Sequence, residues 1–91
     1  MKSGYNILWT DHALKELQQT IEYLEDNFSE KEIKRLALKI ENITGLISQN
    51  PRIFVKSEFK NVYKIVVLKF NTMYYRVRGN NVEILSFFSN R

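Results

Sequence analysis

The 91-residue sequence predicts a single α+β domain over residues 1–91. Three observations predict this class. A short alternating apolar run opens the chain, two stretches with apolar residues at every third or fourth position follow it, and three β-rich runs close it. We therefore expect the order β-α-α-β-β-β: an N-terminal strand, an antiparallel helical hairpin and a three-stranded antiparallel meander. The helices should pack on one face of the sheet.

The first strand is expected over residues 5–9, where the side chains alternate between two faces. Thr10 or Asp11 can cap the helix that follows, because their side-chain oxygens accept hydrogen bonds from the first turn. That helix should end near Asn27. Its apolar stripe is predicted to be core and consists of Leu14, Leu17, Ile21, Leu24 and Phe28.

A second helix begins after Ser29, which forms an S-x-x-E capping box with Glu32. Asn50-Pro51 ends it, and the short connection to the first helix makes the two antiparallel. Residues 52–61 give a mixed signal between a loop and a short strand. The apolar stripe of the second helix consists of Ile33, Leu36, Ile40, Ile43 and Ile47.

The meander is expected over residues 62–68, 72–77 and 82–88. Gly79-Asn80 predicts a tight turn between the last two strands, because glycine accepts a positive φ. Lys69-Phe70-Asn71 predicts a three-residue loop with Asn71 in the left-handed region. This loop places Lys64 opposite Arg76.

Side chains alternate along these strands, which gives the sheet an inner and an outer face. The inner set is apolar and should pack on the helices: Tyr63, Ile65, Val67, Met73, Tyr75, Val77, Val82 and Ile84. The outer set is amphipathic: Lys64, Val66, Thr72, Tyr74, Arg76, Arg78, Glu83, Leu85 and Phe87. Arg76 and Glu83 are expected to form a cross-strand ion pair.

The composition excludes several kinds of functional site. The absence of cysteine excludes disulfides, thiolate metal sites and a cysteine nucleophile, and we expect no metal and no cofactor. No apolar run reaches membrane-spanning length and the N-terminus lacks a signal-peptide core, so we expect a cytoplasmic protein without membrane contact. Residues 11–50 hold five Lys/Arg and eight Asp/Glu, whereas residues 51–91 hold eight and two. The basic half indicates either an anionic partner or a solvated surface.

Several segments together resemble the RelE/ParE superfamily of toxins from bacterial type II toxin–antitoxin systems, the plasmid stabilisation type. The segments are Trp-Thr-Asp-His-Ala-Leu-Lys-Glu-Leu at 9–17, Asn50-Pro51, Tyr-Lys-Ile at 63–65, Tyr-Tyr-Arg-Val at 74–77, Val-Glu-Ile-Leu at 82–85 and Arg91. The resemblance implies a small α+β toxin with a concave outer sheet face. It also implies a cognate antitoxin that wraps and neutralises the toxin in a hetero-oligomer.

The superfamily contains two kinds of toxin. RelE-like members cleave mRNA in the ribosomal A site without a metal, and the resemblance gives Lys64 the role of phosphate contact or proton transfer and Arg91 that of phosphate clamp. Arg76 and Arg78 can replace part of the missing positive charge, but they lie toward the hairpin end. Val66 stands where such nucleases can carry a second lysine, and no Tyr or His follows Phe88. About half of the catalytic set is therefore missing.

ParE-like members inhibit DNA gyrase by protein binding and need no nuclease chemistry. The apolar outer residues suit a protein partner better than RNA. The expected partner-binding residues are Val66, Tyr74, Arg78, Leu85 and Phe87. The sequence thus favours a ParE-like toxin that acts on gyrase. A ribosome-dependent mRNA endonuclease is the alternative, a non-toxic basic interaction module is the third reading, and Lys64 as a plain solvated residue stays open.

Overall fold

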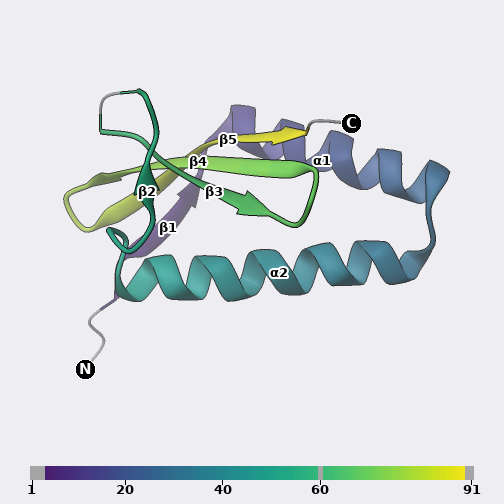
Figure 1. Ribbon diagram of the computed structural model, residues 1–91, viewed down its shortest axis with the longest axis horizontal. Coiled ribbons are helices and arrows are strands. Elements are labelled where there is room, and N and C mark those ends of the chain that lie inside the picture. Colours follow the sequence, from purple (N-terminus) through teal and green to yellow (C-terminus); the bar gives the residue numbers. More distant parts are fainter. Residues whose placement is uncertain (1–3, 60, 90–91) are drawn as a thin grey trace.

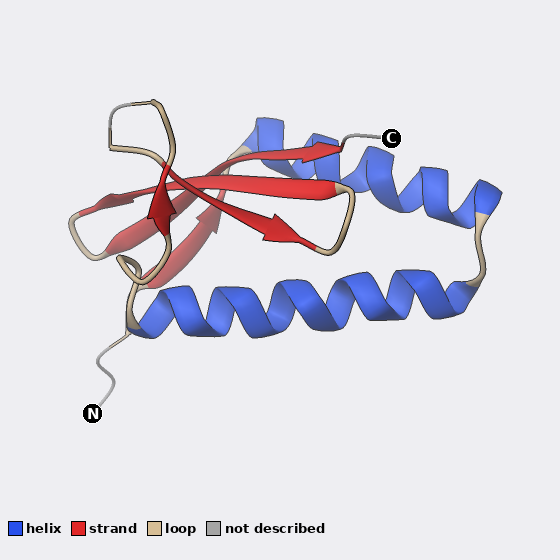
Figure 2. Ribbon diagram, in the orientation of Figure 1, coloured by secondary structure: helices blue, strands red, loops and turns tan. Residues whose placement is uncertain are grey.

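The computed structural model describes residues 4–59 and 61–89. Its helices and strands form two layers, with the helices over one face of the sheet (Figures 1 and 2), so the predicted α+β class is confirmed. The elements are β1 (Asn6–Trp9), α1 (Asp11–Asn27), α2 (Glu30–Gln49), β2 (Val55–Lys56), β3 (Tyr63–Val67), β4 (Asn71–Arg78) and β5 (Asn81–Ser89). Within the described ranges, neither helix combines the length and the apolar character that a membrane-spanning segment requires.

The strands form one sheet with the order β1-β5-β4-β3-β2. The meander β3-β4-β5 is antiparallel, as predicted, whereas β1 pairs with β5 in parallel. β2 is a two-residue strand inside the segment whose sequence signal was mixed, and it pairs with the start of β3. The sheet is therefore wider than the meander, with β1 and β2 at its two edges.

The two helices run in opposite directions from a short connection, as Figure 1 shows. Thr10 is the N-cap of α1, and its side chain accepts a hydrogen bond of 3.2 Å from the Ala13 amide. Ser29 is the N-cap of α2, but its side chain makes no capping bond. The predicted capping box is wrong in this respect, because the Glu32 amide bonds instead to the Ser29 carbonyl at 3.0 Å.

The helices contribute unequally to the core. Leu36, Ile43 and Ile47 of α2 are buried, whereas α1 buries Ala13, Thr20 and Leu24. The prediction that the whole apolar stripe of α1 is core is wrong at its ends, where Leu14 and Phe28 are about half exposed. Leu14 follows Ala13 and so points about 100° away from it around the helix; Phe28 lies at the C-cap.

The β3–β4 hairpin has the predicted loop length but a different position. Val67 pairs with Asn71, so the loop consists of residues 68–70, one residue earlier than expected. Leu68 takes the left-handed conformation with φ 57°, and Asn71 begins β4 as a buried residue. Lys64 therefore faces Tyr74 and not Arg76, and the predicted register is wrong by two residues. The loop still has three residues, so the inner and outer faces of β3 keep their predicted sides.

β5 contains a bulge that the sequence pattern did not reveal. Tyr74 pairs with Ser86 and Tyr75 pairs with Ile84, which leaves Leu85 as the extra residue. The extra residue reverses the alternation beyond it. Phe87 consequently points into the core and is 1% exposed, so its predicted placement on the outer face is wrong. Phe88 is instead 50% exposed.

Candidate functional site

The face of the sheet opposite the helices carries a shallow groove, which we call the outer groove. Its lining is mostly apolar and it encloses about 500 Å³. Phe59 comes from the segment before β3, and its ring lies edge-on to Tyr74 of β4 with centroids 6.3 Å apart. The lining residues are Phe59, Val62, Tyr74, Leu85, Ser86 and Phe88. Two of the predicted partner-binding residues, Tyr74 and Leu85, thus meet in one groove.

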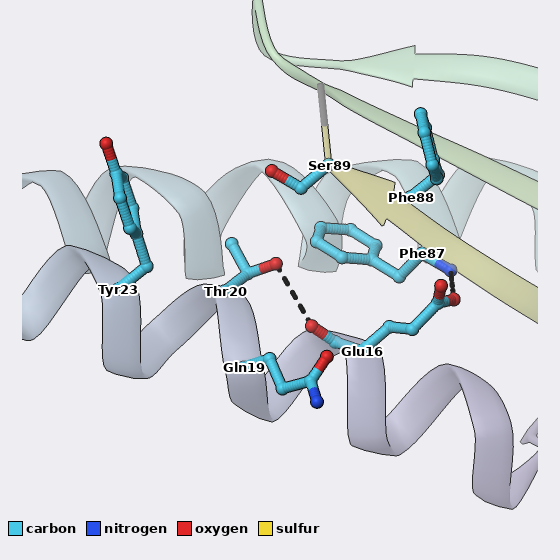
Figure 3. A pocket seen from close by; sticks show the side chains of 7 residues that line it. All are labelled: Glu16, Gln19, Thr20, Tyr23, Phe87, Phe88 and Ser89. Atoms are coloured by element: carbon cyan, nitrogen blue, oxygen red, sulfur yellow. Dashed lines mark hydrogen bonds between the residues drawn. The ribbon is translucent and has the colours of Figure 1, made fainter. Parts of the chain in front are cut away.

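The bulge in β5 shapes this groove, because it provides Leu85 and brings Phe88 into the lining. A bulge takes backbone polar groups out of the strand ladder, and these groups need other partners. One carboxylate oxygen of Glu16 in α1 accepts a hydrogen bond of 2.8 Å from the Phe87 amide (Figure 3) and another of 2.8 Å from the Ser86 hydroxyl. The second turn of α1 therefore holds the bulge from the inner side.

Thr10 adds to this contact. Its amide and its hydroxyl both donate to the Ile84 carbonyl, at 3.1 and 2.9 Å. Thr10 thus caps α1 and fixes β5 at the same time. Sequence reasoning identified the cap and missed Glu16, although a carboxylate between the buried Ala13 and Thr20 was an available signal.

The predicted ion pair between Arg76 and Glu83 is confirmed. The two residues face each other across β4 and β5, and Nε of Arg76 lies 2.6 Å from Oε1 of Glu83. Nη1 of Arg78 lies 3.7 Å from the other carboxylate oxygen. The hydrogen bond from Arg76 is the largest effect on the pKa of Glu83 and lowers it; burial opposes it, and the charges of Arg76 and then Arg78 add to the lowering. Two of the outer cations therefore share one carboxylate.

Lys64 is exposed in β3 between Val55 of β2 and Tyr74 of β4. It forms no ion pair with any residue that the structure describes. Val66, the next outer residue of β3, is 60% exposed. Arg91, the third cation of the predicted nuclease set, lies outside the described residues.

Metal-binding side chains are sparse in this structure. No group of three or more His, Asp or Glu side chains in residues 4–59 and 61–89 is arranged to hold a metal ion. His12 is exposed on α1, and its Nε2 lies 3.3 Å from Oε1 of Glu16. Tyr74 and Ser86 are the polar residues that line the outer groove, and the Ser86 hydroxyl donates to Glu16, so the lining is mainly apolar. Such a surface is suited to binding another macromolecule through apolar contacts.

Several solved structures share this fold. A chain from the structure of the chromosomal ParDE toxin–antitoxin system of P. aeruginosa aligns over 96% of this chain and 97% of its own, with a TM-score of 0.78 and 16% identity. A chain from the YoeB dimer of Staphylococcus aureus aligns over 98% and 100%, with a TM-score of 0.67 and 19% identity. The YoeB/ParE toxin of Agrobacterium tumefaciens aligns over 94% and 99%, with a TM-score of 0.65 and 13% identity. At these identities the similarity establishes the fold.

The sequence comparisons identify the family. No curated protein matches the chain. One family model, described as the ParE toxin of the type II toxin–antitoxin system parDE, matches residues 7–91. The match covers nearly the whole chain and agrees with the RelE/ParE resemblance in the sequence. The chain therefore belongs to the ParE toxin family of type II toxin–antitoxin systems.

Proposed function

We propose that this toxin inhibits DNA gyrase by binding it through the outer groove. The observation that carries the proposal is the contrast between the groove and the cations beside it. The groove presents aromatic and aliphatic side chains to solvent, whereas Arg76 and Arg78 are paired with Glu83. Exposed apolar patches of this kind mark protein-binding sites.

Tyr74, Leu85 and Phe88 form the centre of the proposed contact, and Val66 and Arg78 extend it along the sheet. Phe88 replaces Phe87 in this role, because Phe87 is buried. Tyrosine and phenylalanine at the centre of an interface commonly carry most of its binding energy.

The proposal includes neutralisation by a cognate antitoxin in the cytoplasm. The similar structures include the ParDE system of P. aeruginosa and a heterotetrameric YoeB–YefM toxin–antitoxin complex of Staphylococcus aureus. Both belong to toxin–antitoxin systems, which supports a toxin–antitoxin hetero-oligomer for this chain too. Co-expression with the antitoxin should therefore restore the growth of cells that the toxin alone arrests.

A supercoiling assay with purified gyrase tests the proposed target. The wild-type chain should inhibit supercoiling, and Phe88→Ser should weaken inhibition by about tenfold or more, as expected for a residue at the centre of an interface. Leu46→Ser is the matched control, because Leu46 of α2 is 52% exposed and Phe88 is 50% exposed. Absence of inhibition by the wild-type chain would remove gyrase as the target. Full inhibition by Phe88→Ser would exclude the outer groove as the surface that binds gyrase.

A ribosome-dependent mRNA endonuclease is the second candidate, and Lys64 is the observation that favours it. Its ammonium group is exposed on the outer face and unpaired within the described residues, so it is available for an RNA phosphate. Primer extension on mRNA from arrested cells would then show cuts at ribosomal A sites, and Lys64→Ala would abolish toxicity. Under the gyrase proposal, Lys64→Ala remains toxic. Normal growth of cells that express the chain alone would support a non-toxic module instead.

A further inference from the structure

We propose that the N-terminal half of α2 binds an acidic segment of a partner protein that carries apolar side chains. The surface concerned is a second groove of about 420 Å³, which we call the α2 groove. It lies between α2 and the β3–β4 loop. Its lining residues are Lys31, Lys34, Arg35, Leu38, Lys39, Asn42 and Leu68.

The charge of the α2 groove is entirely positive. Four cations line it and no carboxylate does. Lys31, Lys34 and Leu38 follow each other at three- and four-residue spacing, so they lie along one side of the helix. Glu32 is 3.8 Å from Arg35, but this pair is exposed and contributes little in water. Clustered cations with so little compensation attract an anionic partner.

The apolar residues of the α2 groove favour a protein over a nucleic acid as its partner. Leu38 is 61% exposed in the middle of the cations, and Leu68 meets it from the β3–β4 loop. Phosphates would pair with the cations but would leave both leucines in water. No aromatic side chain lines the groove, so it offers no surface on which bases could stack. A peptide segment with carboxylates around an apolar side chain can pair with the cations and also cover Leu38 and Leu68.

The α2 groove is separate from the outer groove. It belongs to the helical layer, whereas the outer groove lies on the face of the sheet that the helices leave uncovered. The two surfaces have no lining residue in common. The inference therefore does not rest on the proposed action on gyrase, and either can fail without the other.

Fluorescence anisotropy with a defined probe tests the inference. The probe is a fluorescein-labelled helical peptide with leucines at three- and four-residue spacing and glutamates at the remaining positions. It should bind the wild-type chain, and affinity should fall as salt rises. The double variant Lys34→Glu/Lys39→Glu should weaken binding by about tenfold or more, as should Leu38→Ser. A probe with serine in place of leucine should bind about tenfold more weakly.

The control is Lys56→Glu/Lys64→Glu, which changes the net charge equally but in β2 and β3. It should leave the affinity for the probe unchanged, and an equal loss would show that only the overall charge matters. Equal binding of the leucine and serine probes would also overturn the inference. So would tighter binding of a labelled DNA duplex that depends on Lys34 and Lys39. Circular dichroism of each variant confirms that it is folded, and Leu38→Ser, which keeps all charges, tests the groove independently of the lysines.

Discussion

The two glycines Gly79 and Gly45 have different backbone conformations. Gly79 occupies the β4–β5 turn with φ 60°, a conformation that costs a residue with a side chain about 1 kcal/mol or more. Gly45 lies inside α2, where glycine is less favourable than alanine. A methyl group added at either position meets no atom within 4 Å. Backbone conformation alone therefore decides the effect of an alanine substitution at each.

Gly79→Ala should lower the free energy of unfolding by about 1 kcal/mol, because alanine is strained at positive φ. Gly45→Ala should raise it by about 0.5–1 kcal/mol, because alanine loses less backbone entropy in a helix. Urea unfolding followed by circular dichroism measures both changes. A shift of the same sign in the two variants would contradict this account.

Glu83 makes stability depend on pH. Its pKa is lowered in the folded protein from an ordinary value of 4.5, chiefly by the hydrogen bond from Arg76. The folded state therefore binds the proton less readily than the unfolded state. The stabilisation is present above pH 4.5 and is lost as the pH falls through the lowered pKa.

Thermal unfolding of the wild-type chain and Glu83→Gln measures this contribution. The wild type should be more stable than the variant at neutral pH, and the difference should shrink below pH 4.5. A difference between the two proteins that stays constant down to pH 3 would show that the carboxylate charge of Glu83 contributes nothing, since a glutamate of the unfolded chain, with a pKa of about 4.3, is mostly protonated by then.

Among the elements, the contact between the second turn of α1 and the bulge in β5 connects the fold to the outer groove. Glu16 holds the bulge from the helical side through the Phe87 amide and the Ser86 hydroxyl. Leu85 and Phe88 of the same bulged segment line the groove on the other side of the sheet. The geometry of the proposed binding surface therefore depends on a carboxylate that does not line it.

Glu16→Ala should lower the free energy of unfolding by about 1–3 kcal/mol, because it leaves the Phe87 amide and the Ser86 hydroxyl without their acceptor. Glu16→Gln should cost less, since an amide oxygen still accepts hydrogen bonds. His12→Ala is the control: its side chain is 68% exposed, and the variant should unfold within about 0.5 kcal/mol of the wild type. Equal effects of Glu16→Ala and His12→Ala in chemical denaturation would exclude this role for Glu16.

The same contact shows how far the sequence could predict the structure. Local patterns predicted both helices, the three strands of the meander and the pair of Arg76 with Glu83, because each depends on neighbours within a few residues along an element or across a hairpin. The bulge at Leu85 was not predictable in this way, since its hydrogen-bond acceptor is 70 residues away in Glu16. Phe87 was misplaced for that reason.

The β3–β4 loop was displaced by one residue for a different reason. Asparagine favours the left-handed region more than leucine does, so the local rule selected Asn71. Leu68 adopts that conformation instead, with φ 57°, and Asn71 becomes a buried residue of β4. Both registers keep Val67 and Met73 on the inner face, so the burial of these two side chains does not explain the displacement.

At the scale of the whole molecule, one edge of the sheet is formed by pairing of β1 with β5, the strands that are farthest apart in the sequence. β1 pairs with β5, and Thr10 bonds to Ile84 over a separation of 74 residues. The helical hairpin and the meander depend on much closer neighbours in sequence. Because distant contacts are costly in chain entropy, β1 is expected to dock after the other elements have formed.

Ile7→Ala tests this order of folding. Ile7 of β1 is partly buried against the core, so its truncation should destabilise the protein by about 1–3 kcal/mol. If β1 docks late, the variant should unfold faster while its folding rate hardly changes, which corresponds to a φ-value near zero. Stopped-flow refolding and unfolding followed through Trp9 fluorescence gives both rates. A folding rate reduced in proportion to the lost stability would place β1 in the folding nucleus.

The position of β5 between β1 and β4 has a consequence for synthesis on the ribosome. Tyr74 lies in β4, but Leu85 and Phe88 lie in β5, so a nascent chain that still lacks β5 has no outer groove. The apolar residues Ile7 and Trp9 of β1 likewise have no strand to join until β5 has left the exit tunnel. An mRNA broken before the codons of β5 would thus yield a chain that cannot bind through this groove.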